Sequence, residues 1–67
     1  MKLVPKLLQI RESQGRGRPW VASKIGIGRS TLESWEKGES MVPYDKARAL
    51  ARLYGVTLEG LYEEVEE

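Results

Sequence analysis

The stretch Gly26-Ile27-Gly28 constrains the fold most, because its two glycines interrupt sequence that has the apolar spacing of amphipathic helices. It suggests a phosphate-binding loop, a flexible linker, or a corner between two helices. A dinucleotide-binding loop needs a preceding strand and a third glycine, where this chain has Thr31. A flexible linker would not carry the apolar, β-branched Ile27. The pattern therefore favours the corner: Gly26 ends one helix with a positive φ, Ile27 fills the angle, and Gly28 caps the next helix.

Residues that typically begin or end helices also divide the rest of the chain. Pro19 suits the first turn of a second helix, and Gly38 and Gly55 are placed to end the third and fourth. Thr57 is the expected N-cap of a last helix. The apolar spacing thus predicts an all-α fold, a compact bundle of about five short helices over residues 3–13, 19–25, 29–37, 43–54 and 58–65, with no strand.

Length and composition exclude several functional classes. The 67 residues suffice for one domain with a modest core. The chain has no cysteine and no histidine, so it has neither disulfides nor the usual zinc ligands, and it offers no nucleophile–base pair. No apolar run approaches the roughly 18 residues of a membrane span. We therefore expect no enzyme, and no metal, cofactor or small-molecule ligand.

Charge is distributed unevenly although the net charge is only +1. The segment up to Arg29 holds seven basic residues and one acid, whereas the segment from Ser30 onward holds four basic residues and nine acids. Small soluble domains can segregate charge by chance. The asymmetry nevertheless indicates one surface suited to a polyanion and another that is kept away from it.

Residues 18–38, RPWVASKIGIGRSTLESWEKG, resemble the helix-turn-helix of Cro and phage repressors, the XRE-like or lambda-repressor-like family. The most specific part is RSTLESWEKG, and GVTL at residues 55–58 resembles the family's last helices. The resemblance implies a single DNA-binding domain over residues 1–67, with an acidic end at 63–67. It also implies a cytoplasmic, bacterial, archaeal or phage-encoded protein that binds double-stranded, pseudo-palindromic operator DNA as a homodimer.

The resemblance further implies which residues contact DNA. The third helix would enter the major groove, with its first turns at the base edges. This implies base contacts from Arg29, Ser30, Thr31, Glu33 and Ser34, and phosphate contacts from Arg16, Gly17, Arg18, Gly28, Lys37 and Ser40. Arg29 would bind guanine or, alternatively, clamp a phosphate. The chain departs from the family at Gly17 and Gly28, where a hydroxyl cap is usual, and at Arg18, where glutamine is usual.

Three further side chains have structural or open roles. We expect Trp35 in the core, and Glu36 paired with a basic residue of the first two helices. Trp20 would pack on the first helix, lie on the DNA backbone, or cover a partner surface.

These features predict a sequence-specific DNA-binding regulator of transcription, more specifically a repressor. The alternatives are a purely structural helix corner and an antitoxin-type module, which uses the same fold to bind a partner protein.

Overall fold

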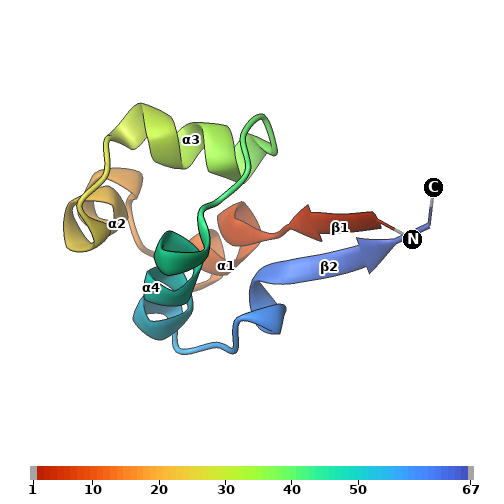
Figure 1. Ribbon diagram of the computed structural model, residues 1–67. Coiled ribbons are helices and arrows are strands. Elements are labelled where there is room, and N and C mark those ends of the chain that lie inside the picture. The colour runs from red at the N-terminus through yellow and green to blue at the C-terminus, as the bar shows by residue number, and fades with distance from the viewer. Residues whose placement is uncertain (1, 67) are drawn as a thin grey trace.

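The computed structural model describes residues 2–66, so Met1 and Glu67, the last residue of the acidic end, lie outside it. Four helices form the body, and a pair of short strands extends from it (Figure 1). In chain order the elements are β1 (Lys2–Pro5), α1 (Leu7–Ser13), α2 (Arg18–Ile25), α3 (Arg29–Lys37), α4 (Tyr44–Tyr54), a 3₁₀ turn (Glu59–Leu61) and β2 (Tyr62–Val65).

One hydrophobic core joins all four helices and the 3₁₀ turn. Its buried members are Leu7, Val21, Ala22, Leu32, Trp35, Ala47, Leu50, Ala51, Tyr54 and Leu61. The small Ala22, Ala47 and Ala51 let the helices approach closely, while the four leucines are among the largest side chains that are fully buried. The predicted helical fold class and the core position of Trp35 are confirmed.

The Gly26-Ile27-Gly28 stretch is a helix corner, as predicted. Gly26 has φ 73° and ψ 38°, the left-handed conformation that a Cβ disfavours. Its N–H and that of Ile27 bond back to carbonyls of Ser23 and Ala22, which closes the end of α2. Gly28 is extended, with φ −79° and ψ 156°, and its carbonyl accepts the first bond of α3 from the Leu32 N–H.

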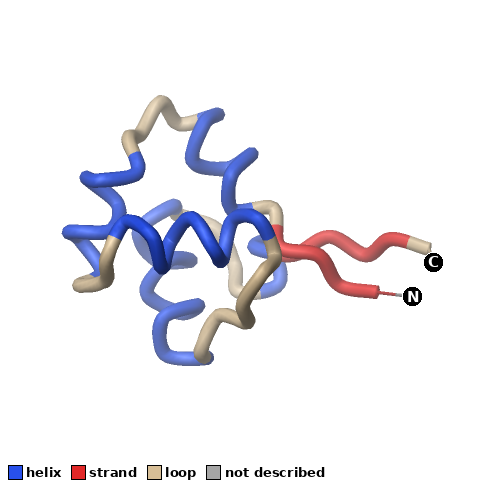
Figure 2. The backbone as a smooth tube through the Cα atoms, turned by 90° about the horizontal axis from the view of Figure 1, so that it is seen from above, coloured by secondary structure: helices blue, strands red, loops and turns tan. Residues whose placement is uncertain are grey.

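Residues 2–5 and 62–65 form strands, not the helices expected there. β1 and β2 are antiparallel, with Leu3 opposite Glu64 and Pro5 opposite Tyr62. The expected first helix therefore begins only at Leu7. The backbone groups of each strand bond to a partner some 60 residues away in the sequence. The apolar spacing within one segment does not reveal such a long-range contact. Figure 2 shows both strands extending together out of the helical part.

The 3₁₀ turn takes the place of the expected last helix. Leu58, not the expected Thr57, stands at its N-cap position, although the Thr57 hydroxyl accepts a hydrogen bond from the Gly60 N–H at 3.0 Å. That turn ends at Leu61, whose carbonyl accepts a bond from the Lys6 N–H at 2.9 Å. This bond joins the turn to the start of α1 and directs the following residues into β2.

Candidate nucleic-acid interface

The outer face of α3 carries the residues expected at base edges. Leu32 and Trp35 point into the core, with 0% and 5% of their surfaces exposed, and so fix the orientation of the helix. All five predicted base-contacting residues lie on the remaining surface. Arg29, Ser30 and Thr31 are exposed, and Glu33 and Ser34 are half-buried. A helix of nine residues with this division of its faces can present side chains to a groove while its other face stays packed.

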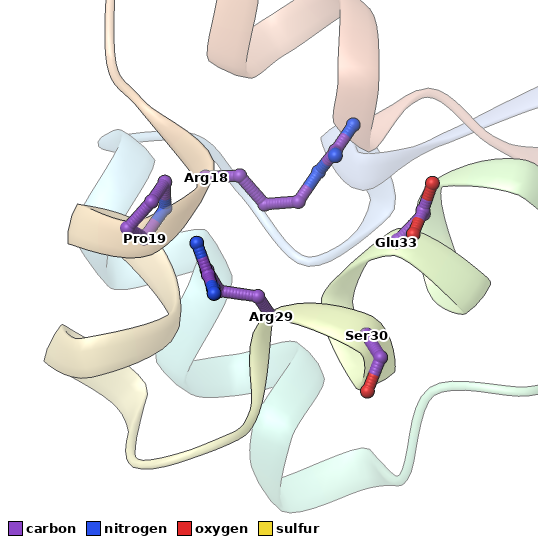
Figure 3. Close-up of a pocket in the computed structure, with 5 residues that line it drawn as sticks. All are labelled: Arg18, Pro19, Arg29, Ser30 and Glu33. Atoms are coloured by element: carbon purple, nitrogen blue, oxygen red, sulfur yellow. The ribbon is translucent and has the colours of Figure 1, made fainter.

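An open hollow lies between the first turns of α2 and α3. It has a volume of about 540 Å³ and is lined by Arg18, Pro19, Arg29, Ser30 and Glu33. In Figure 3 the Arg29 side chain extends from the start of α3 toward Pro19, while Arg18 enters from the start of α2. The N-termini of α2 and α3 and the exposed Arg29 make this part of the surface attractive to an anion such as phosphate, while the Glu33 carboxylate that also lines the hollow opposes it.

A buried carboxylate links the three helices around this hollow. The side chain of Glu36 in α3 is only 1% exposed and forms ion pairs with Arg11 at 2.6 Å and Arg18 at 3.2 Å. The prediction that Glu36 pairs with a basic residue of the first two helices is therefore confirmed. Because Glu36 holds the Arg18 guanidinium on one side, the position of Arg18 relative to α3 is defined before any anion binds.

The basic partner of Glu36 in α1 is Arg11, a residue that the sequence did not single out. It is 8% exposed, and it also donates to the Arg16 carbonyl at 2.9 Å, which ties α1 to the loop before α2. The hydrogen bond to Glu36 raises the pKa of Arg11 above its ordinary value, against the opposing effect of burial. The available signal was its position four residues after Leu7, on the inward side of α1.

Arg16 and Trp20 form a second cationic feature at the start of α2. The Arg16 guanidinium lies over the Trp20 ring at 4.5 Å from its centroid, and the Lys24 ammonium lies at 5.4 Å. Arg16 also donates to the Gln14 side chain at 3.1 Å. Trp20 itself is 40% exposed. Its ring thus holds two cations, Arg16 from the loop before α2 and Lys24 from the last turn of that helix.

The remaining predicted phosphate contacts lie around the ends of α3. Gly28 has open space around it: an added Cβ would meet only the Thr31 hydroxyl, at 3.9 Å. Lys37 pairs with Glu33 at 3.2 Å, yet its side chain stays 58% exposed. Ser40 follows α3 in an exposed loop. The structure therefore places Gly28 and Arg29 at the start of α3, and Lys37 and Ser40 at and beyond its end. Arg18 lines the same hollow as Arg29, but its guanidinium lies on Glu36, near the end of α3.

Comparison with known proteins agrees with this geometry. A helix-turn-helix domain family matches residues 4–63. The chain belongs to this family, and it carries a helix-turn-helix DNA-binding domain of the XRE-like type. A crystal structure of a Bacteroides fragilis protein, to which DNA binding has been attributed, is similar in fold, with a TM-score of 0.86. The two share 19% identity over 92% of this chain and 100% of the other. No curated protein sequence matches significantly.

Residues 2–66 contain neither a membrane-spanning helix nor a cluster of metal ligands. No helix in this range has the length and apolar character that crossing a membrane requires. Nor do these residues bring three or more carboxylate, imidazole or thiol groups together as metal ligands.

Proposed function

We propose that this helix-turn-helix domain is a sequence-specific transcriptional regulator, and that it represses by occupying an operator as a homodimer. The observation that carries the proposal is the division of α3: one face is locked into the core by Leu32 and Trp35, and the other presents Arg29, Ser30 and Ser34. A short recognition helix gives little specific contact area, so two copies on a two-fold operator are expected.

In this proposal Arg29 reads a base and Arg18 grips a phosphate. Arg29 stands at the first turn of α3 with an exposed side chain, so its planar fork is free to bind guanine O6 and N7. Arg18 is held by Glu36 and is 35% exposed, an arrangement suited to a positioned, sequence-independent contact. Arg16 on Trp20, Gly17, Gly28, Lys37 and Ser40 would add further backbone contacts. Thr31, Glu33 and Ser34 would complete the base-edge surface.

Selection of bound sites from random double-stranded DNA, followed by affinity measurements at several salt concentrations, tests the proposal. A two-fold symmetric consensus is the expected result. Arg18→Ala should weaken binding to selected and random DNA alike and lower the salt slope by about one unit. Arg29→Ala should lose discrimination at one base position, by about 1–3 kcal/mol.

Arg29→Lys is the matched variant that separates a base contact from a phosphate clamp. It keeps the charge and removes the bidentate fork. A base contact predicts that Arg29→Lys loses discrimination almost as Arg29→Ala does. If Arg29→Lys instead binds like the parent chain, Arg29 clamps a phosphate. If no sequence is selected at all, the regulator proposal is wrong.

A further inference from the structure

The outer edge of β2 presents backbone groups that are not used within the described part of the chain. The Lys6 N–H donates to the Leu61 carbonyl, and facing residues of an antiparallel pair alternate between those that exchange such bonds and those that do not. The register therefore turns the N–H and C=O groups of Glu64 away from β1. The Tyr62 N–H, which also points away, is bonded to the Glu59 carbonyl. Within residues 2–66 the Tyr62 C=O and both groups of Glu64 have no backbone partner.

The outer edge of β1 differs because it carries Pro5. Pro5 faces Tyr62 in the register, so its nitrogen also points away from the partner strand. Proline has no N–H, and on an edge strand it prevents further pairing. Addition of another strand is therefore disfavoured at β1 and open at β2.

A largely apolar hollow lies beside the free edge of β2. It has a volume of about 360 Å³ and is lined by Leu3, Leu58, Glu59, Tyr62 and Glu64. The turn that carries Glu59 lies on the side of β2 away from β1 (Figure 1). Leu3 is 63% exposed and shares one face of the strand pair with Tyr62 and Glu64. An extended segment added to β2 would direct every second side chain toward this hollow.

The exposed side chains around this edge are acidic. Glu59, Glu63, Glu64 and Glu66 are all exposed, and none of them forms an ion pair within the described chain. Two copies of β2 paired edge to edge would bring these carboxylates against one another, and facing like charges destabilise a strand pair. Basic side chains would instead place a cation opposite each carboxylate. The charge thus disfavours a second copy at this edge and favours a basic partner.

We propose that the outer edge of β2 binds an extended, basic segment of another protein by strand addition. The backbone of that segment bonds to the Tyr62 C=O and to both backbone groups of Glu64. In the antiparallel orientation, apolar side chains lie opposite Tyr62 and Val65, and basic side chains lie opposite the three glutamates of residues 63–66. None of the predicted DNA-contacting residues lines the hollow, so the proposal does not rest on the proposed function.

The probe is the peptide acetyl-Lys-Val-Arg-Lys-Leu-amide, whose five residues face residues 66 to 62 in this register. It is titrated at low salt into the isotope-labelled full chain, and the amide signals are followed by nuclear magnetic resonance. The signals of residues 62–66 should shift and saturate with a dissociation constant of about 1 mM or below. Raising the salt concentration to about 0.5 M should weaken binding, because the ion pairs are exposed and therefore screened.

A second peptide separates strand addition from simple attraction between charges. It has the same sequence and charge, but its arginine carries a methyl group on the backbone nitrogen. The N–H that is replaced is the one that donates to the Glu64 C=O in the proposed register. The methylated peptide should therefore bind about tenfold more weakly, or worse. Equal binding of the two peptides would overturn the proposal.

Two variants of the chain test the same edge. Glu64→Gln removes one carboxylate and should weaken binding about threefold. Glu64→Pro also removes the outward N–H, as Pro5 does on β1, and should weaken binding by a further factor of about ten. The control is Asp45→Asn, which makes the same change in charge at the start of α4 and should bind like the parent chain. Circular dichroism ensures that only folded variants are compared, and the methylated peptide tests the backbone bond on the parent chain itself.

The titration gives three further results that would contradict strand addition by a basic partner. The first is the absence of any shift at residues 62–66 up to about 10 mM peptide. The second is a set of shifts confined to another part of the chain. The third is a shift of the same signals when the parent chain alone is concentrated, which would mean that a second copy occupies the edge.

Discussion

The helix-turn-helix and the strand pair differ in how far apart in the sequence their contacting segments lie and in how much apolar surface they bury. In the helix-turn-helix, α2 and α3 are adjacent in sequence, turn at Gly26, and bury Val21, Ala22, Leu32 and Trp35. In the strand pair, the partners come from the two ends of the chain, and Leu3 remains 63% exposed. The first region is defined by local signals and a shared core, and the second by backbone pairing over a long separation. Stability should therefore depend far more on the first.

The largest effect should come from Glu36→Gln in α3. Removing this carboxylate leaves the buried Arg11 without its charged partner, which costs about 3–5 kcal/mol. For a domain of 67 residues this is a large part of the free energy of unfolding. Urea denaturation measures the loss, with Glu33→Gln as the control in the same helix. Glu33 makes only an exposed pair with Lys37, so its loss should cost under about 0.5 kcal/mol. Equal effects would mean that the buried pairs are energetically unimportant.

The same substitution at Leu7 and Leu3 tests the boundary between the two regions directly. Leu7→Ala should cost about 2–5 kcal/mol, because Leu7 is 1% exposed in the core. Leu3→Ala should cost below about 1 kcal/mol, measured by thermal unfolding at a protein concentration low enough to keep the chain monomeric. Were residues 3–13 one helix, the two leucines would share a face, and their losses would be similar.

The sequence could predict the helix-turn-helix almost residue by residue because its signals are local. Gly26, Gly38 and Gly55 each end a helix with a positive φ, and apolar spacing identifies the inward faces of α3 and α4. The predicted partner class of Glu36 was also correct. The ends were assigned wrongly because Leu3, Val4 and Tyr62 fit a helical stripe when each segment is considered alone. Only the distant pairing partner distinguishes a strand there.

In the candidate site, too, the features set by local sequence could be predicted and those set by distant contacts could not. The outward residues of α3 follow from helix periodicity once Leu32 and Trp35 are assigned to the core. Other contacts join different segments of the chain: Arg11 and Arg18 lie around Glu36, and Arg16 lies over Trp20. Helix periodicity does not predict such contacts, which became visible only in the three-dimensional structure. Which of these residues touch DNA stays a prediction for the binding measurements above.

A smaller effect is expected at alkaline pH, from Tyr54 at the end of α4. Burial raises the pKa of Tyr54 to about 12, and the nearby Glu36 carboxylate adds to the rise. A folded-state pKa above the unfolded value of 10.0 means that this stability is complete below pH 10 and is lost as the pH rises toward 12. The full loss should be about 2–3 kcal/mol, and about half of it should have occurred at pH 11.

Tyr54→Phe is the matched variant for that measurement. The Tyr54 hydroxyl is buried without a hydrogen-bond partner in the described chain, so removing it should leave stability at neutral pH unchanged or slightly higher. Unfolding by urea at pH 8 and pH 11 compares the two chains. If Tyr54→Phe loses as much stability as the parent chain between these values, another group is responsible.

The smallest changes in stability are expected at the two glycines of the corner, and they should be opposite in sign. Gly26→Ala forces a Cβ into φ 73° and should cost about 1–2 kcal/mol. Gly28→Ser should instead stabilise by a few tenths of a kcal/mol, since Gly28 is extended and its side chain would cap α3. Thermal unfolding measures both. Should Gly28→Ser stabilise the fold yet weaken operator binding, the bare backbone of Gly28 lies against the DNA.

The antiparallel register has a practical use in protein engineering. Because Lys2 lies opposite Val65, a linker of a few residues can join the two ends and close the backbone into a ring. New ends can then be opened in the exposed loop at residues 39–41, between α3 and α4. Such a circular permutant would convert the long-range strand pair into a hairpin and leave both helices of the helix-turn-helix intact.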